Sequence, residues 1–344
     1  MKGRLIALDT WRGREAAALM VDGRLEDLLI DADRPRPGHI YRAVADRPLK
    51  GQGGMFLRTP DGSAFLRGAK GMAPGDRLLV QVTGYAEGGK AIPVTDRLLF
   101  KSRYAIVTPD APGINVSRRI RDEDARDAVL AAAHDALANT PLPEGAGLIL
   151  RSSCETAAED DIAEDVAAMA GLAAQVLADP GTEPELLVEG DAPHALAWRD
   201  WVEPAEIDAG DGSFARHGVD EAIEALLAPR VDLPGGGWMM VEPTSALVAV
   251  DINTGADGSP AAGLKANIAA FRDLPRQLRL RGLGGQIVVD PAPSPKKERK
   301  QLDQVLRAGL KRETTESVLA GWTAMGLVEI QRKRDRLPLT EILR

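Results

Sequence analysis

Two stretches of this sequence end a run of apolar, β-branched residues in an aspartate. The first is Ala246–Asp251, which continues to Asn253, and the second is Gly285–Asp290. Such runs are typical of buried strands. If the two strands are neighbours in one sheet, the oxygen-bearing side chains of Asp251, Asn253 and Asp290 emerge together at its edge. Mg²⁺ binds through one or two carboxylates plus waters and substrate phosphates, so the pattern favours phosphodiester chemistry at this edge.

An alternative exists for each part of this pattern. Asp-x-Asn at a strand end is also good turn chemistry. Between the two runs, a helix carries Arg272, Arg276 and Arg279 at i, i+4 and i+7. These arginines share a helix face that can hold phosphates, although a solvated face would show the same spacing. Pro275 predicts a kink in this helix or the start of a second one.

The rest of the chain supplies the elements that would position these residues. Short strands separated by turn residues predict a small all-β barrel over residues 37–97, with strands at His39–Ala45, Gly54–Leu57, Ala64–Arg67 and Arg77–Thr83. Helices are predicted over residues 122–138, 156–178 and near 220–227, with Thr156 as an N-cap and a buried strand at Leu148–Arg151. The chain after residue 237 alternates strand and helix, as in an α/β unit.

Composition and charge limit the class of protein. The chain has 344 residues, 44% of them hydrophobic, which indicates a globular protein with a substantial core. It shows no apolar run of transmembrane length and no signal peptide, and its single Cys154 excludes a disulfide framework and a cysteine-rich zinc site. A cytoplasmic location without a membrane span is expected. The four histidines show no ligand spacing.

The net charge of −8 is unevenly distributed. Residues 1–120 carry 20 Lys and Arg against 13 Asp and Glu, residues 121–262 carry 6 against 29, and residues 263–344 carry 17 against 9. Basic ends around an acidic middle are typical of proteins that bind a polyanion, although solvated faces would give the same counts.

The C-terminal third resembles the ribonuclease E/G family. The family's order of motifs is present as Asp251-Ile-Asn253, then Arg276-Gln-Leu-Arg-Leu-Arg281, then Gly284-Gly-Gln-Ile-Val-Val-Asp290. Leu233-Pro-Gly-Gly-Gly and Gly326-Leu-Val-Glu-Ile-Gln-Arg-Lys-Arg334 also match. By this resemblance Asp251 and Asp290 are the magnesium ligands, and Asn253 supports the metal or the scissile phosphate.

The resemblance implies a multidomain α+β and α/β fold. The expected parts are a ribonuclease H-like subdomain (1–36 plus 195–236), an inserted S1-like OB barrel (37–97), a 5′-phosphate sensor region (98–194) and a DNase I-like catalytic subdomain (237–344). In the barrel, Phe56 and Phe65 match the family's RNA-stacking aromatics and Lys90 its basic contact. A Phe in a short strand is otherwise usually a core residue.

The resemblance also places a pocket for a 5′-monophosphate. Arg118, Arg119, Arg151 and Ser152 match the family's sensor segments. The guanidinium of Arg151 and the hydroxyl of Ser152 would grip a terminal phosphate. The alternative for Arg151 is a salt bridge to the acidic run Glu155–Asp165.

Some family features are missing. The Cys-Pro-x-Cys zinc link and the small domain after it are expected to be absent, which allows a homodimer only without a zinc link. Ser245 stands where members usually carry Glu, the loop 256–262 is shorter, and Pro291-Ala-Pro293 replaces a stretch that often has another acid.

The predicted function is a Mg²⁺-dependent, single-strand-selective endoribonuclease of RNA processing or decay. It acts on messenger or ribosomal RNA precursors, leaves 5′-phosphate products and is open to stimulation by 5′-monophosphate ends. A non-catalytic or weakly active RNA-binding or ribosomal RNA maturation protein with the same fold is the main alternative. A magnesium phosphohydrolase for small molecules is a third, but it leaves the barrel unexplained.

Overall fold

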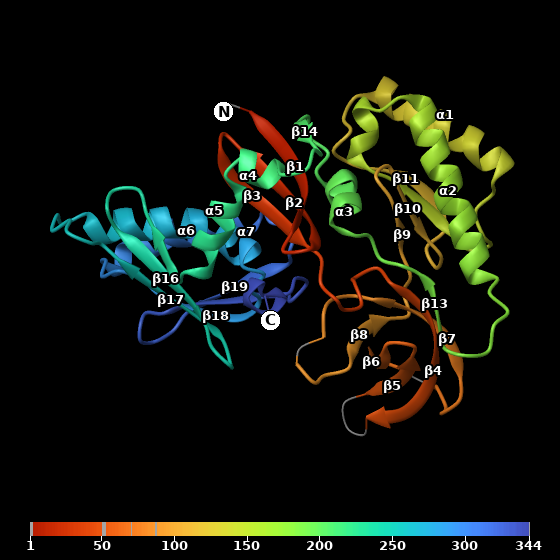
Figure 1. Cartoon of the computed structure of the whole chain (residues 1–344), viewed down its shortest axis with the longest axis horizontal. Helices are drawn as coiled ribbons and strands as arrows, with labels where there is room; N and C mark the ends of the chain where they lie inside the picture. Colours follow the sequence, from red (N-terminus) through yellow and green to blue (C-terminus); the bar gives the residue numbers. More distant parts are fainter. Residues whose placement is uncertain (1–2, 50–52, 70, 87, 344) are drawn as a thin grey trace. The chain divides into compact units, whose positions relative to one another are not determined.

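The chain divides into two compact units of mixed α+β structure (Figure 1). The computed structural model describes residues 3–49, 53–69, 71–86 and 88–343. Unit 1 comprises Met1–Ala32 and Ala205–Arg344, and unit 2 comprises Asp33–Pro204.

Unit 2 contains a closed five-stranded barrel, consistent with the OB or S1 fold. Its strands follow the order β4-β5-β6-β8-β7, and a β4–β7 pairing closes it. They are β4 (Ile40–Leu49), β5 (Gly54–Thr59), β6 (Gly62–Arg67), β7 (Arg77–Val82) and β8 (Ile92–Thr95). The barrel interior is apolar, with Tyr41, Leu57 and Val80 fully buried. β13 (Glu185–Val188) adds to the outer edge of β4. The predicted strands are confirmed, whereas β8 was not among them.

The second part of unit 2 is a small sheet with helices. Its order is β11-β12-β10-β9, formed by β9 (Phe100–Lys101), β10 (Ala105–Thr108), β11 (Gly113–Val116) and β12 (Gly147–Leu150). Helices α1 (Glu123–Asn139) and α2 (Glu159–Leu177) share one buried cluster with it. Asp122 caps α1 through its carboxylate, which accepts from Ala125 N at 2.8 Å. Helix α3 (Pro193–Asp200) ends the unit.

The first sheet of unit 1 has the order β14-β1-β2-β3. It is built from β1 (Arg4–Trp11), β2 (Arg14–Val21), β3 (Arg24–Ile30) and β14 (Glu206–Asp208), which pairs in parallel with β1. Asp22 and Gly23 form the tight turn between β2 and β3, and both have a positive φ, as this type of hairpin turn requires. Helices α4 (Ser213–Arg216) and α5 (Val219–Leu227) pack against this sheet through Phe214 and Ile223.

The second sheet of unit 1 has the order β15-β16-β17-β18-β20-β19. Its strands are β15 (Arg230–Asp232), β16 (Trp238–Pro243), β17 (Val248–Asn253), β18 (Gly285–Asp290), β19 (Ser317–Trp322) and β20 (Val328–Arg332). Helices α6 (Ala262–Leu280) and α7 (Arg299–Leu310) pack on one face through an apolar cluster that includes Phe271, Leu274 and Leu306. The chain ends in the short helix α8 (Leu339–Ile342).

Helix α6 runs from Ala262 to Leu280 with Pro275 inside it, so of the two outcomes predicted for Pro275 the start of a second helix is wrong. A Cβ placed on Gly309 of α7 would lie 3.1 Å from Pro275 Cγ. The absence of a side chain at Gly309 therefore lets the two helices approach closely, and the proline ring becomes part of their packing.

Candidate active site

Asp251 and Asp290 lie directly across from each other at the ends of two neighbouring parallel strands. The register of β17 and β18 runs from Val248 opposite Ile287 to Asp251 opposite Asp290. Directly paired residues project to the same face of a sheet. Because neighbouring strands are about 4.8 Å apart, the two carboxylates share one edge, and both are exposed.

The alternation of side chains along β17 fixes which face carries the site. Val248, Val250 and Ile252 are buried in the cluster beneath α6 and α7. Asp251 and Asn253 therefore project to the opposite face, since side chains alternate along a strand. The apolar positions that bury the strand also force the polar ones outward.

Asn253 is hydrogen-bonded to the first aspartate. Its Nδ2 donates to Asp251 Oδ2 at 2.7 Å, which orients that carboxylate and leaves its Oδ1 for another ligand. The strand then turns sharply at Gly255, which has a φ of +66° and whose Cβ would lie 2.2 Å from Gly236 O. The turn therefore requires glycine on both conformational and steric grounds.

The donor set fits a magnesium ion better than most other metals. Two exposed carboxylates and a carboxamide oxygen are hard ligands, and they leave room for waters and a phosphate. Within the described ranges, no group of three or more His, Cys, Asp or Glu residues is placed to hold a metal. A site that keeps several waters, rather than an all-protein cage, is the arrangement this edge can offer.

Sequence reasoning missed Asn267, which fixes the segment after Asp290. It is fully buried on α6; its Nδ2 donates to Ala292 O at 2.9 Å and its Oδ1 accepts from Ala292 N at 2.9 Å. A lone Asn within the apolar stripe of α6 was the signal that could have found it. Asn267 positions the chain two residues beyond the second carboxylate.

The arginines of α6 do not form the expected phosphate-facing stripe. Arg276 donates to Leu25 O and pairs with Asp273 at 2.8 Å, and Arg279 pairs with Glu26 at 2.7 Å and with Glu313. Their side chains are only 13% and 10% exposed. The helix face that carries these two arginines is turned toward β3. Both side chains are therefore held in ion pairs inside unit 1 instead of facing a phosphate.

Arg272 is the exposed member of the three. It borders a hollow of about 750 Å³ that also contains Arg24, Lys265 and Asp232. Arg24 pairs with Asp273 at 2.6 Å and Lys265 with Asp257 at 3.6 Å. The hollow is therefore a partly neutralised basic surface beside α6.

The barrel brings its two predicted aromatics together. Phe56 and Phe65 are paired across β5 and β6, with ring centroids 5.1 Å apart. The guanidinium of Arg47 lies 5.0 Å from the Phe56 ring centroid. A hollow of about 420 Å³ is lined by Phe56, Arg47 and the exposed Lys90. Both rings are half-buried.

The predicted sensor residues meet at the ends of two other parallel strands. Arg118 and Arg119 follow β11, and Arg151 and Ser152 follow β12, whose Val116 and Leu150 are paired. Arg118 and Arg119 are exposed. The topology therefore places all four residues at one edge of the small sheet.

Arg151 is held by neighbouring groups, but not by the acidic run that was its predicted alternative partner. Its guanidinium donates to Asp200 at 2.9 Å and to the backbone carbonyls of Ser102, Arg103 and Arg199. Burial raises the pKa of the Asp200 carboxyl, but hydrogen bonds and charges from Arg199 and Lys101 bring it well below its ordinary value. Asp200 is therefore an anion that competes with any phosphate for Arg151.

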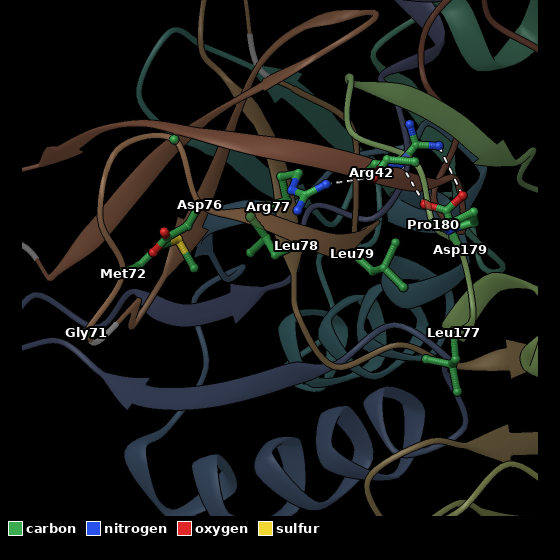
Figure 2. A pocket seen from close by; sticks show the side chains of 12 residues that line it. Arg42, Gly71, Met72, Asp76, Arg77, Leu78, Leu79, Leu177, Asp179 and Pro180 are labelled. Atoms are coloured by element: carbon green, nitrogen blue, oxygen red, sulfur yellow. Dashed lines mark hydrogen bonds and ion pairs between the residues drawn. The ribbon is translucent and has the colours of Figure 1, made fainter.

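A further hollow of about 920 Å³ lies between the barrel and the end of α2 (Figure 2). Arg42 and Arg77 are among the residues that line it, and Figure 2 shows the Arg42 side chain directed toward Asp179. Arg42 binds Asp179 at 2.6 Å and Glu185 at 2.5 Å, and Arg77 binds Gly181 O at 3.2 Å. The charge of Arg42 is matched by these two carboxylates, whereas Arg77 donates to a backbone carbonyl and keeps its charge.

No helix in the described part of the chain is both long and apolar enough to cross a membrane.

Comparison with known proteins places the chain in a family. The model of the ribonuclease E/G family matches residues 100–209 and 205–335. The chain is 27% identical to ribonuclease E of Nostoc sp. (strain PCC 7120) and 28% identical to ribonuclease E of Synechocystis sp. (strain PCC 6803). Each match covers 95% of this chain and 56% of the relative, so the chain spans little more than half the length of those relatives.

A second kind of relative is covered more fully. The chain is 26% identical to ribonuclease G of Escherichia coli (strain K12), over 96% of this chain and 80% of that protein. The family model spans most of the chain, including both strand-end aspartates. This chain therefore belongs to the ribonuclease E/G family.

Proposed function

We propose that this protein is a Mg²⁺-dependent endoribonuclease that cleaves single-stranded RNA. The observation that carries the proposal is the register of Asp251 opposite Asp290 at the ends of β17 and β18. Relatives named ribonuclease E and ribonuclease G support the reaction class.

In this proposal Asp251 and Asp290 hold the metal, and Asn253 keeps the Asp251 carboxylate in position. Magnesium bound there would polarise the scissile phosphate and lower the pKa of a bound water, giving 5′-phosphate and 3′-hydroxyl ends. The exposed Arg272, on the helix side of the sheet, would contact the RNA backbone away from the metal. Arg276 and Arg279 keep a structural role, because their charges are matched within unit 1.

The barrel is proposed to bind the single strand. Phe56 and Phe65 would stack on bases, and Arg47 and Lys90 would attract the backbone. Stacking contributes about 1–3 kcal/mol per base and accepts any sequence. Unstacked bases are accessible only in single strands, which is the basis of the proposed selectivity.

We also propose the finer division of the fold. The sheet β14-β1-β2-β3 with α4 and α5 would be the ribonuclease H-like part. The six-stranded sheet with α6 and α7 would be the DNase I-like catalytic part. The sheet of β9–β12 would be the 5′-sensor region, with Arg118, Arg119, Arg151 and Ser152 at one edge.

The test is cleavage of a 3′-labelled single-stranded RNA by purified protein, with and without Mg²⁺, beside the same sequence as a duplex. The proposal expects Mg²⁺-dependent internal cleavage of the single strand, with a 5′-phosphate on the downstream product. RNA binding without cleavage at any Mg²⁺ concentration would instead fit a non-catalytic RNA-binding protein.

A further inference from the structure

An arginine stacked on a tryptophan lies on the same sheet face as the aspartates. In the antiparallel pairing of β16 and β17, Trp238 is opposite Asn253 and Met240 is opposite Asp251. Directly opposite residues project to the same face. Met239 and Val241, which alternate with them, are buried in the cluster beneath the helices. Trp238 therefore stands on the open face, next to Asn253.

The guanidinium of Arg230 lies over this ring. It comes from β15, where it pairs with Met240, and its Cζ is 4.3 Å from the centre of the Trp238 ring. Its Nε donates to Asp232 Oδ1 at 2.9 Å. The Arg230 side chain is nevertheless 52% exposed, so the guanidinium has a partner on one side and space on the other.

The Trp238 ring also contacts the turn that follows the Asp-Ile-Asn motif. A Cβ on Gly255 would lie 3.3 Å from Trp238 Cζ3. The stack is thus packed against the chain that leaves Asn253. Trp238 and Asp251 are diagonal neighbours on the adjacent strands β16 and β17. Such residues are about 7–8 Å apart, a distance that one nucleotide can span.

We propose that Arg230, held on Trp238, is a seat for the nucleobase next to the scissile phosphate of single-stranded RNA. This inference rests on the proposed endoribonuclease activity and adds a positioning residue to it. A base rather than a phosphate is the expected ligand because Asp232 already matches the charge of Arg230. Guanidinium planes stack on unpaired bases in RNA recognition, and the Trp–Arg pair presents such a plane.

Abasic substitution of the substrate tests the seat directly. A short single-stranded RNA with one cleavage site is made with the base removed at each position in turn. For the parent protein, removing one base beside the cleaved bond lowers kcat/KM about tenfold, mainly through KM. Arg230→Ala lowers kcat/KM on the intact RNA to the same extent and shows no further loss on that abasic substrate.

Two variants separate stacking from charge and from general damage. Arg230→Lys keeps the charge but loses the plane, so it behaves as Arg230→Ala. Arg299→Ala removes a comparable guanidinium, 4.5 Å from the Trp322 ring. Trp322 packs against the buried cluster on the helix side of the sheet, so Arg299→Ala keeps the parental abasic pattern.

The outcomes are distinct. If Arg230→Ala loses as much kcat/KM on the abasic substrate as the parent does, or if Arg230→Lys cleaves as the parent does, the base seat is overturned. The nuclease assignment stands in both cases. If the parent cleaves no RNA, the proposed function fails. RNA binding of the same abasic series is then measured by fluorescence anisotropy. If removal of the one base no longer weakens binding to Arg230→Ala, the base seat is supported. If it weakens binding to Arg230→Ala as much as to the parent, the base seat is refuted.

Discussion

Asp251 and Asp290 face each other across β17 and β18, at the last paired position of two parallel strands. Helix α6 supplies the crossover between these strands, which parallel neighbours require. Ligands in open α/β sheets bind beyond the carboxyl ends of the strands. The topology therefore brings together two carboxylates that lie 39 residues apart in the chain at the edge where a ligand is expected.

Asn253 is expected to act through Asp251. Asn253→Ala removes the 2.7 Å hydrogen bond to Asp251 Oδ2, which frees that carboxylate to rotate. Loss of such a supporting contact lowers metal affinity or activity about 10- to 100-fold. Cleavage rates measured over a Mg²⁺ titration should show a raised Mg²⁺ requirement. Gln331→Ala, at an exposed position of β20, is the control. Its cleavage rate should depend on the Mg²⁺ concentration as that of the parent does.

Asn267 is expected to matter for both stability and activity. Asn267→Ala leaves the backbone N–H and carbonyl of Ala292 without their partners in a buried place. An unsatisfied buried group costs about 1–3 kcal/mol, and urea unfolding measures this loss. Because Ala292 follows Asp290 closely, kcat should fall as well. An unchanged free energy of unfolding would show that water replaces the amide.

The preference for a 5′-monophosphate is expected to depend on Arg151. Cleavage of 5′-monophosphorylated RNA is compared with cleavage of its 5′-hydroxyl form. The parent should prefer the monophosphate, and Arg151→Ala should cleave both at one rate. Arg121→Ala, an exposed arginine close to Arg118 and Arg119 in the chain, is the control that keeps the preference. Equal rates in the parent would refute a 5′-phosphate sensor at Arg151.

The ion pair of Asp27 with Arg336 should make the stability of unit 1 depend on pH. Burial raises the pKa of Asp27, but Arg336 and Arg279 outweigh burial and hold that pKa below its ordinary value. The pair therefore stabilises the fold above the unfolded pKa of about 3.9, and this contribution is lost as the pH falls through the folded pKa.

Arg336→Gln tests that dependence. It is expected to cost about 2–3 kcal/mol near pH 7, because it leaves a mostly buried carboxylate with one partner fewer. Urea unfolding at several pH values measures the free energy of unfolding of the variant and of the parent. The difference between these two free energies should shrink as the pH falls toward about 3. A difference that stays constant with pH would mean that Arg336 contributes through packing alone.

The strand-end aspartates could be predicted because their signal is local. Six-residue β-branched runs predict strands, and one crossover helix leaves few topologies for them. The barrel strands followed from turn residues in the same way. The missed strand β8 has only four residues, contains Pro93, and pairs with only two residues of β7, from which a long loop separates it, so no tight-turn hairpin signal marks it.

The partners of the arginines could not be predicted, because they come from distant parts of the chain. Arg276 and Arg279 bind β3, about 250 residues earlier in the sequence, and Arg151 binds Asp200 instead of the nearer acids. Helical spacing shows that side chains share a face but not what that face meets. Likewise, Thr156 does not cap α2, because Ser152–Thr156 forms a 3₁₀ turn and α2 begins at Glu159.

The joint role of the two aspartates is tested most directly by cleavage rates of Asp251→Asn, Asp290→Asn and the double variant over a Mg²⁺ titration. If both carboxylates hold one metal, each single variant loses at least about a hundredfold in kcat/KM. The double variant then loses little more, because residues that act as a unit are not additive. Parental cleavage by either single variant, with RNA binding intact, would contradict the assignment of this edge as the active site.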